Sequence, residues 1–251
     1  MHIIVLAKVV PDYEVPSADF ELVGNRAHPR YTRMVGMYDE NAVELGVQLK
    51  EKYDAELTIV SYGQNDDVQF LRKTLAMGGD KLVIVEGNSD DPFVIAANLK
   101  EAIASLGEID LILAGRQSSD MDRGVVPGLV AGMLDYPFVP MACTVESMAD
   151  GWKVSQLTET GKRLMKLSGK AVLSITSIPE NVPRIPAVKA IFGAKKKPVD
   201  KLPEIGAKKM AIAEVSVKIP KMESVCELIP AEDMEEAARV LLRRLKEERY
   251  L

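Results

Sequence analysis

The 251-residue sequence contains only two cysteines and two histidines. Cys143 and Cys226 form no CxxC pair and no disulfide framework, so we expect the chain in a reducing compartment. His2 and His28 both lie near the start of the chain and leave almost no material for a histidine-based metal site or catalytic triad. We therefore expect no metal centre and no catalytic residue.

Two further features are missing from the sequence: an excess of basic residues and a long apolar segment. Acidic residues number 37 against 32 basic ones, and a protein that binds nucleic acid has to neutralise phosphates. No apolar run approaches the ~18 residues of a membrane span, and the first apolar segment, residues 2–7, is too short for a signal peptide. These absences predict a cytoplasmic protein without nucleic-acid binding or membrane insertion.

The first half of the chain alternates between short apolar segments and longer amphipathic ones. The apolar segments, rich in Val, Ile and Leu, are Ile3–Ala7, Leu57–Ser61, Leu82–Val85 and Leu111–Ala114. The amphipathic segments are Glu40–Lys52, Asp66–Met77, Pro92–Leu106 and Val125–Leu134. Buried strands separated by helices are typical of βαβ units. The fold class is therefore α/β, with an open, mostly parallel sheet covered on both faces.

Four closely spaced segments after residue 137 have the composition of strands. They are Met141–Glu146, Trp152–Thr158, Arg163–Leu167 and Ala171–Thr176, and glycine-containing turns separate them. We expect them to form a small antiparallel extension of the same sheet. The α/β domain is accordingly placed at residues 1–177.

Residues 178–251 show no compact pattern of their own and are interpreted as an extended arm. Residues 186–209 carry seven lysines against two acidic residues, and a helix with an acidic first turn and basic last turns is expected at about 230–249. A solvated basic linker explains the lysines. It does not explain the apolar residues Ile185, Val188, Ile191 and Phe192, which favour packing on a partner surface.

The loop from Gly115 to Val126 is the most informative candidate for chemistry. It follows an expected strand and leads into an expected helix, so it lies at the carboxyl edge of the sheet, where ligands of open α/β sheets bind. The free N–H groups of the helix start, with Arg116 and Arg123, suit a phosphate. An ordinary connecting loop, capped by Ser119 or Asp120, explains the same residues, because neither a P-loop nor GxGxxG is present.

Four segments carry a resemblance to a known family. They are Val5–Asp12, Tyr38–Glu44, Thr74–Asp80 and Pro183–Pro198. In their order and spacing they resemble the β subunit of electron transfer flavoproteins, and the resemblance covers nearly the whole chain. It implies a Rossmann-like fold of the adenine nucleotide α-hydrolase type.

The resemblance also implies a role, cofactors and partners. The chain would form a heterodimer with an electron transfer flavoprotein α subunit and share with it a redox-active FAD. It would hold AMP or, as in electron-bifurcating members, a second FAD. It would carry electrons between a dehydrogenase, such as an acyl-CoA dehydrogenase, and a further acceptor. We therefore expect an electron carrier subunit rather than a stand-alone enzyme.

Binding positions carry over from the family onto this sequence. The nucleotide positions are Leu6, Ala7, Gly36, Tyr38, Asp39, Tyr62, Gly115, Arg116, Gln117, Ser118, Ser119, Asp120, Met121, Asp122, Arg123, Gly124, Val125 and Val126. The segment at about 183–198 resembles the recognition loop that docks into the dehydrogenase, with Val188 at the anchor position and Ile191 and Phe192 nearby. Bifurcating members have Thr at the position of Arg123 and Gln at that of Val125, so AMP and FAD both stay open.

Two other classes of function remain as alternatives. An ATP-using enzyme of the nucleotide α-hydrolase group would need a Ser- or Gly-rich loop after the first strand, and Ala7–Asp12 has none. A regulatory, stress-type homodimer that binds an adenine nucleotide without a redox role would not need the long arm.

Overall fold

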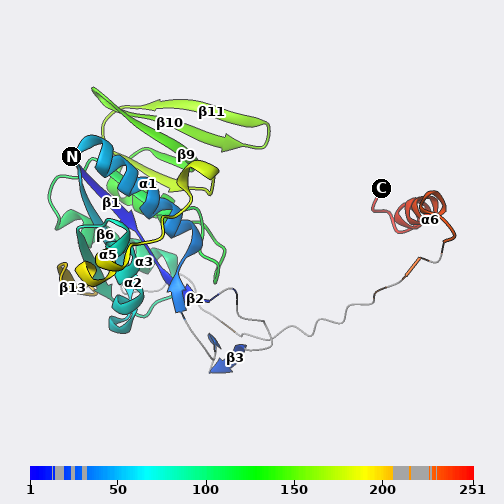
Figure 1. The fold of residues 1–251 in the computed structure, drawn as a ribbon, viewed down its shortest axis with the longest axis horizontal. Helices are drawn as coiled ribbons and strands as arrows, with labels where there is room; N and C mark the ends of the chain where they lie inside the picture. The colour runs from blue at the N-terminus through cyan, green and yellow to red at the C-terminus, as the bar shows by residue number, and fades with distance from the viewer. Residues whose placement is uncertain are drawn as a thin grey trace. The chain divides into compact units, whose positions relative to one another are not determined.

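The computed structural model describes residues 1–12, 14, 20–23, 26–29, 33–205, 215, 226, 228–229 and 231–251. These residues belong to two units, Met1–Val215 and Ser216–Leu251 (Figure 1). Among them, no helix combines the length and apolar character that crossing a membrane requires.

A nine-stranded sheet forms the centre of the first unit. Its strands are β1 (His2–Leu6), β6 (Glu56–Gly63), β7 (Lys81–Glu86), β8 (Leu111–Gly115), β9 (Phe138–Met148), β10 (Gly151–Thr158), β11 (Gly161–Leu167), β12 (Ala171–Ile175) and β13 (Val199–Pro203). Their order is β11-β10-β9-β12-β8-β1-β6-β7-β13. Only the β9–β10 and β10–β11 pairs are antiparallel, which confirms the predicted open, mostly parallel sheet.

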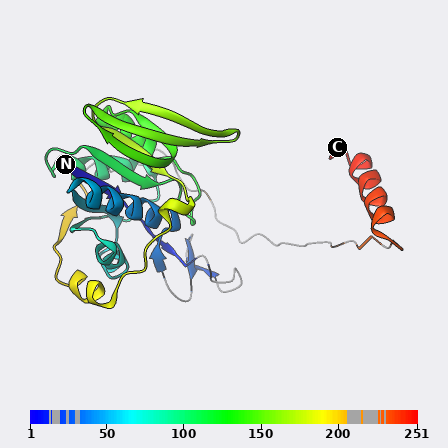
Figure 2. The same cartoon turned by 45° about the horizontal axis from the view of Figure 1, so that its top comes forward.

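Helices cover both faces of this sheet (Figure 2). The helices α1 (Met37–Tyr53) and α2 (Val68–Met77) pack on one face, and α3 (Pro92–Ala104) and α4 (Val126–Leu134) on the other. Successive strand residues alternate between the two cores: Ile3 and Val5 face α1, whereas Ile4 and Leu6 face the opposite core. Since both faces are apolar, the strands appear in the sequence as continuous hydrophobic runs.

The path of the chain creates a switch point at β1. From β1 the chain proceeds outward through β6 and β7, and then returns to place β8 on the other side of β1. All four strands are parallel, so their carboxyl ends share one edge of the sheet. Ligands of open α/β sheets bind at such a point.

The structure differs from the sequence-based expectation in one strand after residue 137. The segment predicted at Ala171–Thr176 forms β12, which is not part of the antiparallel extension. It lies between β8 and β9 and pairs in parallel with both. All five residues of β12 are buried, and a strand without polar alternation belongs in the interior of a parallel sheet. The extension consists of β9, β10 and β11 alone.

Short elements complete the first unit. Two-stranded sheets pair β2 (Val9–Pro11) with β5 (Arg33–Val35) and β3 (Phe20–Val23) with β4 (Arg26–Pro29). Single turns of 3₁₀ helix are η2 (Asn65–Asp67) and η3 (Pro179–Asn181).

The region after residue 177 contains ordered elements that packing explains. Helix α5 (Val188–Ala194) lies on α2, and β13 pairs in parallel with the edge strand β7. The terminal helix expected at about 230–249 is α6 (Met234–Glu247), whose cap Asp233 accepts a hydrogen bond from the N–H of Glu236 at 2.8 Å. Most of the expected arm between 206 and 230 lies outside the described residues. The division into domain 1–177 and arm 178–251 stays a prediction, although residues 178–205 lie within the first unit.

The core predicts a clear stability effect at the central strand β8. Leu113 is fully buried, so Leu113→Ala should lower the free energy of unfolding by about 2–5 kcal/mol through lost burial and a residual cavity. Urea unfolding followed by circular dichroism measures this. The control Leu164→Ala, on β11 and 59% exposed, should change it by no more than about 0.5 kcal/mol. Equal effects of the two variants would contradict the assignment of the core.

Candidate functional site

A cavity of about 270 Å³ opens at the carboxyl ends of β8, β1, β6 and β7. One part of its wall is apolar and comes from strand ends and from α3: Leu6, Val60, Tyr62, Ile95, Leu99 and Ala114. The cavity therefore lies at the switch point of the sheet and offers an apolar surface that suits an aromatic ring.

Charged side chains form another part of the wall. The ammonium group of Lys8 pairs with Asp120 at 2.6 Å, and the guanidinium of Arg33 pairs with Asp67 at 2.7 Å. Arg123 also lines the cavity, and its guanidinium donates to the carbonyl oxygen of Asp90 at 3.5 Å. Cations and carboxylates together suit a ligand with both anionic groups and hydroxyls.

Asp39 joins three elements at the floor of the cavity. Its carboxylate accepts hydrogen bonds from the N–H groups of Lys8, after β1, at 2.8 Å and of Gly115, at the end of β8, at 3.0 Å. It belongs to the first turn of α1, where the helix dipole favours a negative charge. Burial raises the pKa of Asp39 to about 7, although the two backbone hydrogen bonds and Lys8 act in the opposite direction.

The close approach at Gly115 requires a residue without a side chain. A Cβ atom at this position would lie 2.4 Å from Oδ1 of Asp39 and 2.7 Å from its backbone nitrogen. Glycine therefore lets the end of β8 contact the start of α1.

The connection from β8 to α4 is a tight loop. The N–H of Asp122 donates to the carbonyl of Ser118 at 2.8 Å. Asp122 and Gly124 both have positive φ, at 52° and 62°, in the left-handed region that favours glycine. Val125 and Val126, at the start of α4, line the cavity. The free N–H groups of this helix start are therefore close to any anion in the cavity.

Tyr62 links the cavity wall to the residue after β13. Its hydroxyl donates to Glu204 at 2.6 Å and accepts from the N–H of Ser89 at 3.0 Å. Burial, followed by the bond to Glu204, raises the pKa of Tyr62 to about 12. The phenol is therefore neutral near pH 7, and its ring is held in the wall.

The structure brings twelve of the predicted nucleotide positions to the cavity. They are Leu6, Ala7, Asp39, Tyr62, Gly115, Ser118, Asp120, Met121, Arg123, Gly124, Val125 and Val126. Six others are absent from its lining: Gly36, Tyr38, Arg116, Gln117, Ser119 and Asp122. Whether the twelve bind a nucleotide stays a prediction at this point.

The six remaining positions have other contacts. Arg116 lies over the ring of Tyr38, 4.4 Å from its centroid. Gln117 donates to the carboxylate of Asp122 within the loop. Gly36 is buried beside Asp39, and Ser119 is exposed. These residues belong to the loop after β8 and to the start of α1.

Sequence reasoning missed several lining residues, among them Arg33, Asp67 and the segment 87–90. The segment Gly87–Asp90 directly follows an apolar run, so its place at a strand's carboxyl end was a usable signal. Asp67 likewise follows closely after the run ending at Ser61. Arg33 had no such signal, because the short strand that carries it precedes α1 without a hydrophobic pattern.

Asp39 predicts a pH dependence of stability. The folded protein keeps a proton on this carboxyl up to about pH 7, whereas the ordinary pKa of the unfolded chain is 3.8. The stabilisation that the protonated Asp39 gives the folded state is therefore fully present below the unfolded pKa of 3.8. It is lost as the pH rises to the folded pKa of about 7. The free energy of unfolding of the wild type relative to Asp39→Asn should fall between about pH 4 and about pH 7, by at most about 1.4 kcal/mol per pH unit.

Urea unfolding at several pH values measures this difference. The control Asp150→Asn, at an exposed turn position, should show no such trend relative to the wild type. A constant difference between wild type and Asp39→Asn across the range would show that Asp39 titrates alike in both states.

Comparisons with known proteins agree with this geometry. The profile of the family described as "Electron transfer flavoprotein domain" matches residues 32–206. An electron transfer flavoprotein subunit beta of Syntrophomonas wolfei is 34% identical over 82% of this chain and 86% of its own length. Those of Thermoanaerobacterium thermosaccharolyticum and Clostridium acetobutylicum are each 30% identical, over 98% of both chains and 100% of both chains respectively. The chain therefore belongs to the electron transfer flavoprotein family, as one of its beta subunits, and has a role in electron transfer.

Proposed function

We propose that the chain holds an adenine nucleotide in the cavity at the carboxyl edge of its sheet and pairs with an α subunit around a redox-active FAD. It carries electrons between a dehydrogenase, such as an acyl-CoA dehydrogenase, and a further acceptor, in the cytoplasm. The observation that carries this proposal is the cavity itself, at the switch point of a sheet whose family transfers electrons.

The residues present fit an adenine nucleotide. The apolar wall, with the ring of Tyr62, suits the adenine, and the carboxylates suit ribose hydroxyls. Lys8, Arg33, Arg123 and the start of α4 supply positive charge and N–H groups for phosphate. Gly115 allows the end of β8 to approach Asp39, so that both residues line the cavity.

The size of the cavity favours AMP over a second FAD. Its volume of about 270 Å³ lies near the lower end of the ~300–1,000 Å³ of small-molecule sites. A mononucleotide matches this better than a dinucleotide does. The flavin shared with the α subunit supplies the chemistry of electron transfer. In this proposal the chain binds the nucleotide and helps to orient the flavin, and it contributes neither a catalytic acid nor a catalytic base.

The docking part of the proposal rests on exposed apolar residues at α5. Val188 is 69% exposed and Ile185 is 94% exposed, and Ile191 and Phe192 are also exposed. Exposed lysines are nearby in the chain, at 189, 195 and 196. Apolar anchors within a charged rim are typical of a protein interface. No observation favours the regulatory homodimer, since the family has an electron-transfer role.

Loss of the cation at residue 123 should weaken nucleotide binding. Arg123→Ala removes a guanidinium from the cavity wall, so the purified protein should retain several-fold less adenine nucleotide per chain. Denaturation followed by chromatography measures the nucleotide, and the absorbance spectrum measures flavin separately. Arg163→Ala, on the exposed strand β11, should leave the content unchanged. Full nucleotide content in Arg123→Ala would exclude this residue from phosphate binding.

Truncation of the anchor should impair electron transfer without loss of flavin. Val188→Ala removes apolar surface from α5, so the apparent KM of a partner dehydrogenase for this protein should rise several-fold, as expected for the loss of about 1 kcal/mol of binding. Stopped-flow reduction of the flavin by an acyl-CoA dehydrogenase measures this. Val23→Ala, at a position 58% exposed on β3, is the matched control. Identical kinetics of both variants and the wild type would contradict the anchor role.

A further inference from the structure

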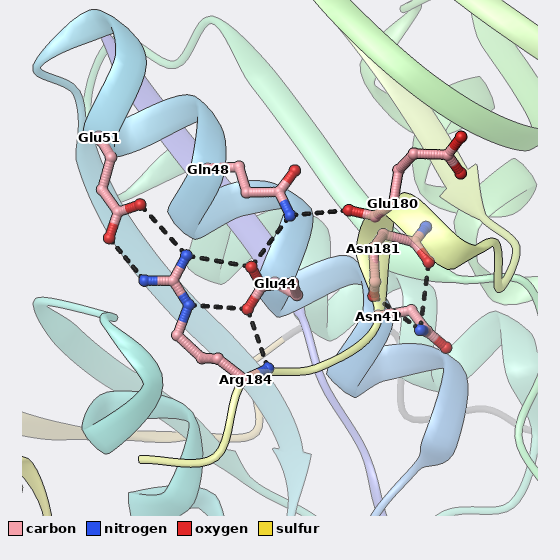
Figure 3. A network of polar contacts seen from close by, with 7 residues as sticks. All are labelled: Asn41, Glu44, Gln48, Glu51, Glu180, Asn181 and Arg184. Atoms are coloured by element: carbon pink, nitrogen blue, oxygen red, sulfur yellow. Dashed lines mark hydrogen bonds and ion pairs between the residues drawn. The ribbon is translucent and has the colours of Figure 1, made fainter. Parts of the chain in front are cut away.

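A row of polar side chains follows one face of α1. Asn41, Glu44, Gln48 and Glu51 are spaced by three, four and three residues, which places them on one face of a helix (Figure 3). All four contact the strap, which we define as residues 178–184 between the sheet and α5. The row is therefore the surface that holds the chain just before residues 185–194, which we call the docking segment.

Side-chain amide groups fix the first part of the strap. The side chain of Asn41 donates to the carbonyl oxygen of Asn181 at 2.9 Å, and that of Gln48 donates to the carbonyl oxygen of Glu180 at 2.9 Å. Asn181 itself donates to the carbonyl of Thr176 at 2.8 Å and is buried. The bond from Asn41 satisfies a carbonyl of the strap at the buried residue Asn181, which would otherwise lack a partner away from water.

Arg184 then binds two carboxylates at once (Figure 3). Its Nε and one terminal nitrogen donate to Glu44 at 2.8 and 3.0 Å, and its terminal nitrogens donate to Glu51 at 2.5 and 3.1 Å. The backbone N–H of Arg184 adds a bond to Glu44 at 3.1 Å. Such paired, charge-assisted bonds fix direction as well as distance, and a lysine does not reproduce them.

The two carboxylates differ in burial. The side chain of Glu44 is 6% exposed and that of Glu51 is 59% exposed. Burial alone raises the pKa of Glu44, but hydrogen bonds from Arg184 and Gln48 outweigh this and hold the pKa below its usual value. Hydrogen bonds to Glu44 and Glu51 raise the pKa of Arg184. A charged carboxylate that is shielded from water needs a cation as its partner. The strap is therefore most stable where Arg184 lies next to Glu44.

Two prolines restrict the backbone that connects Arg184 to the docking segment. Pro183 and Pro186 flank Arg184 and Ile185, and each proline restricts both its own φ and the residue before it. We call the paired bonds of Arg184 to Glu44 and Glu51 the clamp. The chain between this clamp and the start of α5 therefore has few alternative conformations.

The far end of the docking segment is also anchored. Arg72 donates to the carbonyl oxygen of Ala194 at 2.7 Å, and the ammonium group of Lys197 donates to the carbonyl oxygens of Leu75 and Gly79 at 2.9 and 2.6 Å. Ala194 is buried in the core beneath α2. The seven residues of α5 are too few to form a stable helix alone. Its shape therefore depends on the two anchored ends.

We propose that Arg184 is a positioning residue for dehydrogenase docking, because its clamp on Glu44 and Glu51 orders the segment 185–194 and presents its exposed apolar residues in one conformation. A pre-ordered segment loses less conformational entropy on binding, so the clamp strengthens docking without touching the partner. The docking role itself rests on the proposed function, whereas the ordering of the segment does not.

Amide hydrogen exchange of the full-length protein tests the ordering. In Arg184→Ala the peptides that cover 185–194 should exchange at least about tenfold faster than in the wild type. Peptides from β1 and β8 should keep their protection. Arg184→Lys, which reaches one carboxylate at a time, should give an intermediate rate. Arg163→Ala, at an exposed arginine of β11, is the matched control and should leave all rates unchanged.

The unequal burial of the two glutamates gives a second test that does not depend on changing Arg184. Glu44→Gln should speed exchange in 185–194 more than Glu51→Gln does, because the pair with Glu44 is shielded from water and the pair with Glu51 is screened. Adding salt to about 0.5 M should affect wild-type exchange little. Equal effects of the two variants, or a uniform rise across the sheet, would show that these residues only support overall stability and would overturn the proposal.

Kinetics separate the positioning role from the docking function. With a purified acyl-CoA dehydrogenase as probe, Arg184→Ala should raise the apparent KM for this protein by about tenfold with little change in kcat. Faster exchange with an unchanged KM, in a system where Val188→Ala does raise KM, would overturn the proposal. If neither variant alters KM, the proposed docking function fails, and faster exchange then still identifies the clamp.

Discussion

The need to bury both faces of a parallel sheet determines most of this structure. Strand residues alternate between two apolar cores, and each core needs its own pair of helices. The helices cover both faces of the central parallel strands, so polar side chains that act on a ligand have no room there. They gather where strands end, and the order of β8, β1, β6 and β7 places four carboxyl ends around one cavity. The position of the site follows from the burial of the sheet.

Asp39 shows how this edge is held together. One buried carboxylate accepts the N–H groups that end β1 and β8 while it begins α1. Gly115 permits the contact because it has no side chain. Asp39, Lys8 and Gly115 all line the cavity, so the hydrogen bonds that connect β1, β8 and α1 also fix the position of its wall. Tyr62 extends this link to Glu204, beyond the docking segment.

The arm region combines two opposite properties. Its exposed apolar residues leave surface for a partner, yet both ends of the segment are fixed. At one end Arg184 binds Glu44 of α1, and at the other end Arg72 of α2 binds the carbonyl oxygen of Ala194. A seven-residue helix has no independent stability, so these anchors decide its conformation. The proposed docking segment and the candidate nucleotide site thus both depend on α1, which carries Asp39 at its start and the row ending at Glu51 further along.

The sequence by itself determined the local elements and the general place of the site. Continuous apolar runs identified the parallel strands β1, β6, β7 and β8, and amphipathic segments identified the helices α1 to α4. The loop after the strand predicted to end at Ala114 identified part of the cavity wall. These signals come from residues near one another in the chain. Tertiary structure alone decided the insertion of β12 between β8 and β9, the pairing of β13 with β7, and the contribution of Arg33. It also decided which residues form the clamp, because Arg184 and Glu44 lie 140 residues apart and the sequence around either residue does not indicate the other as its partner.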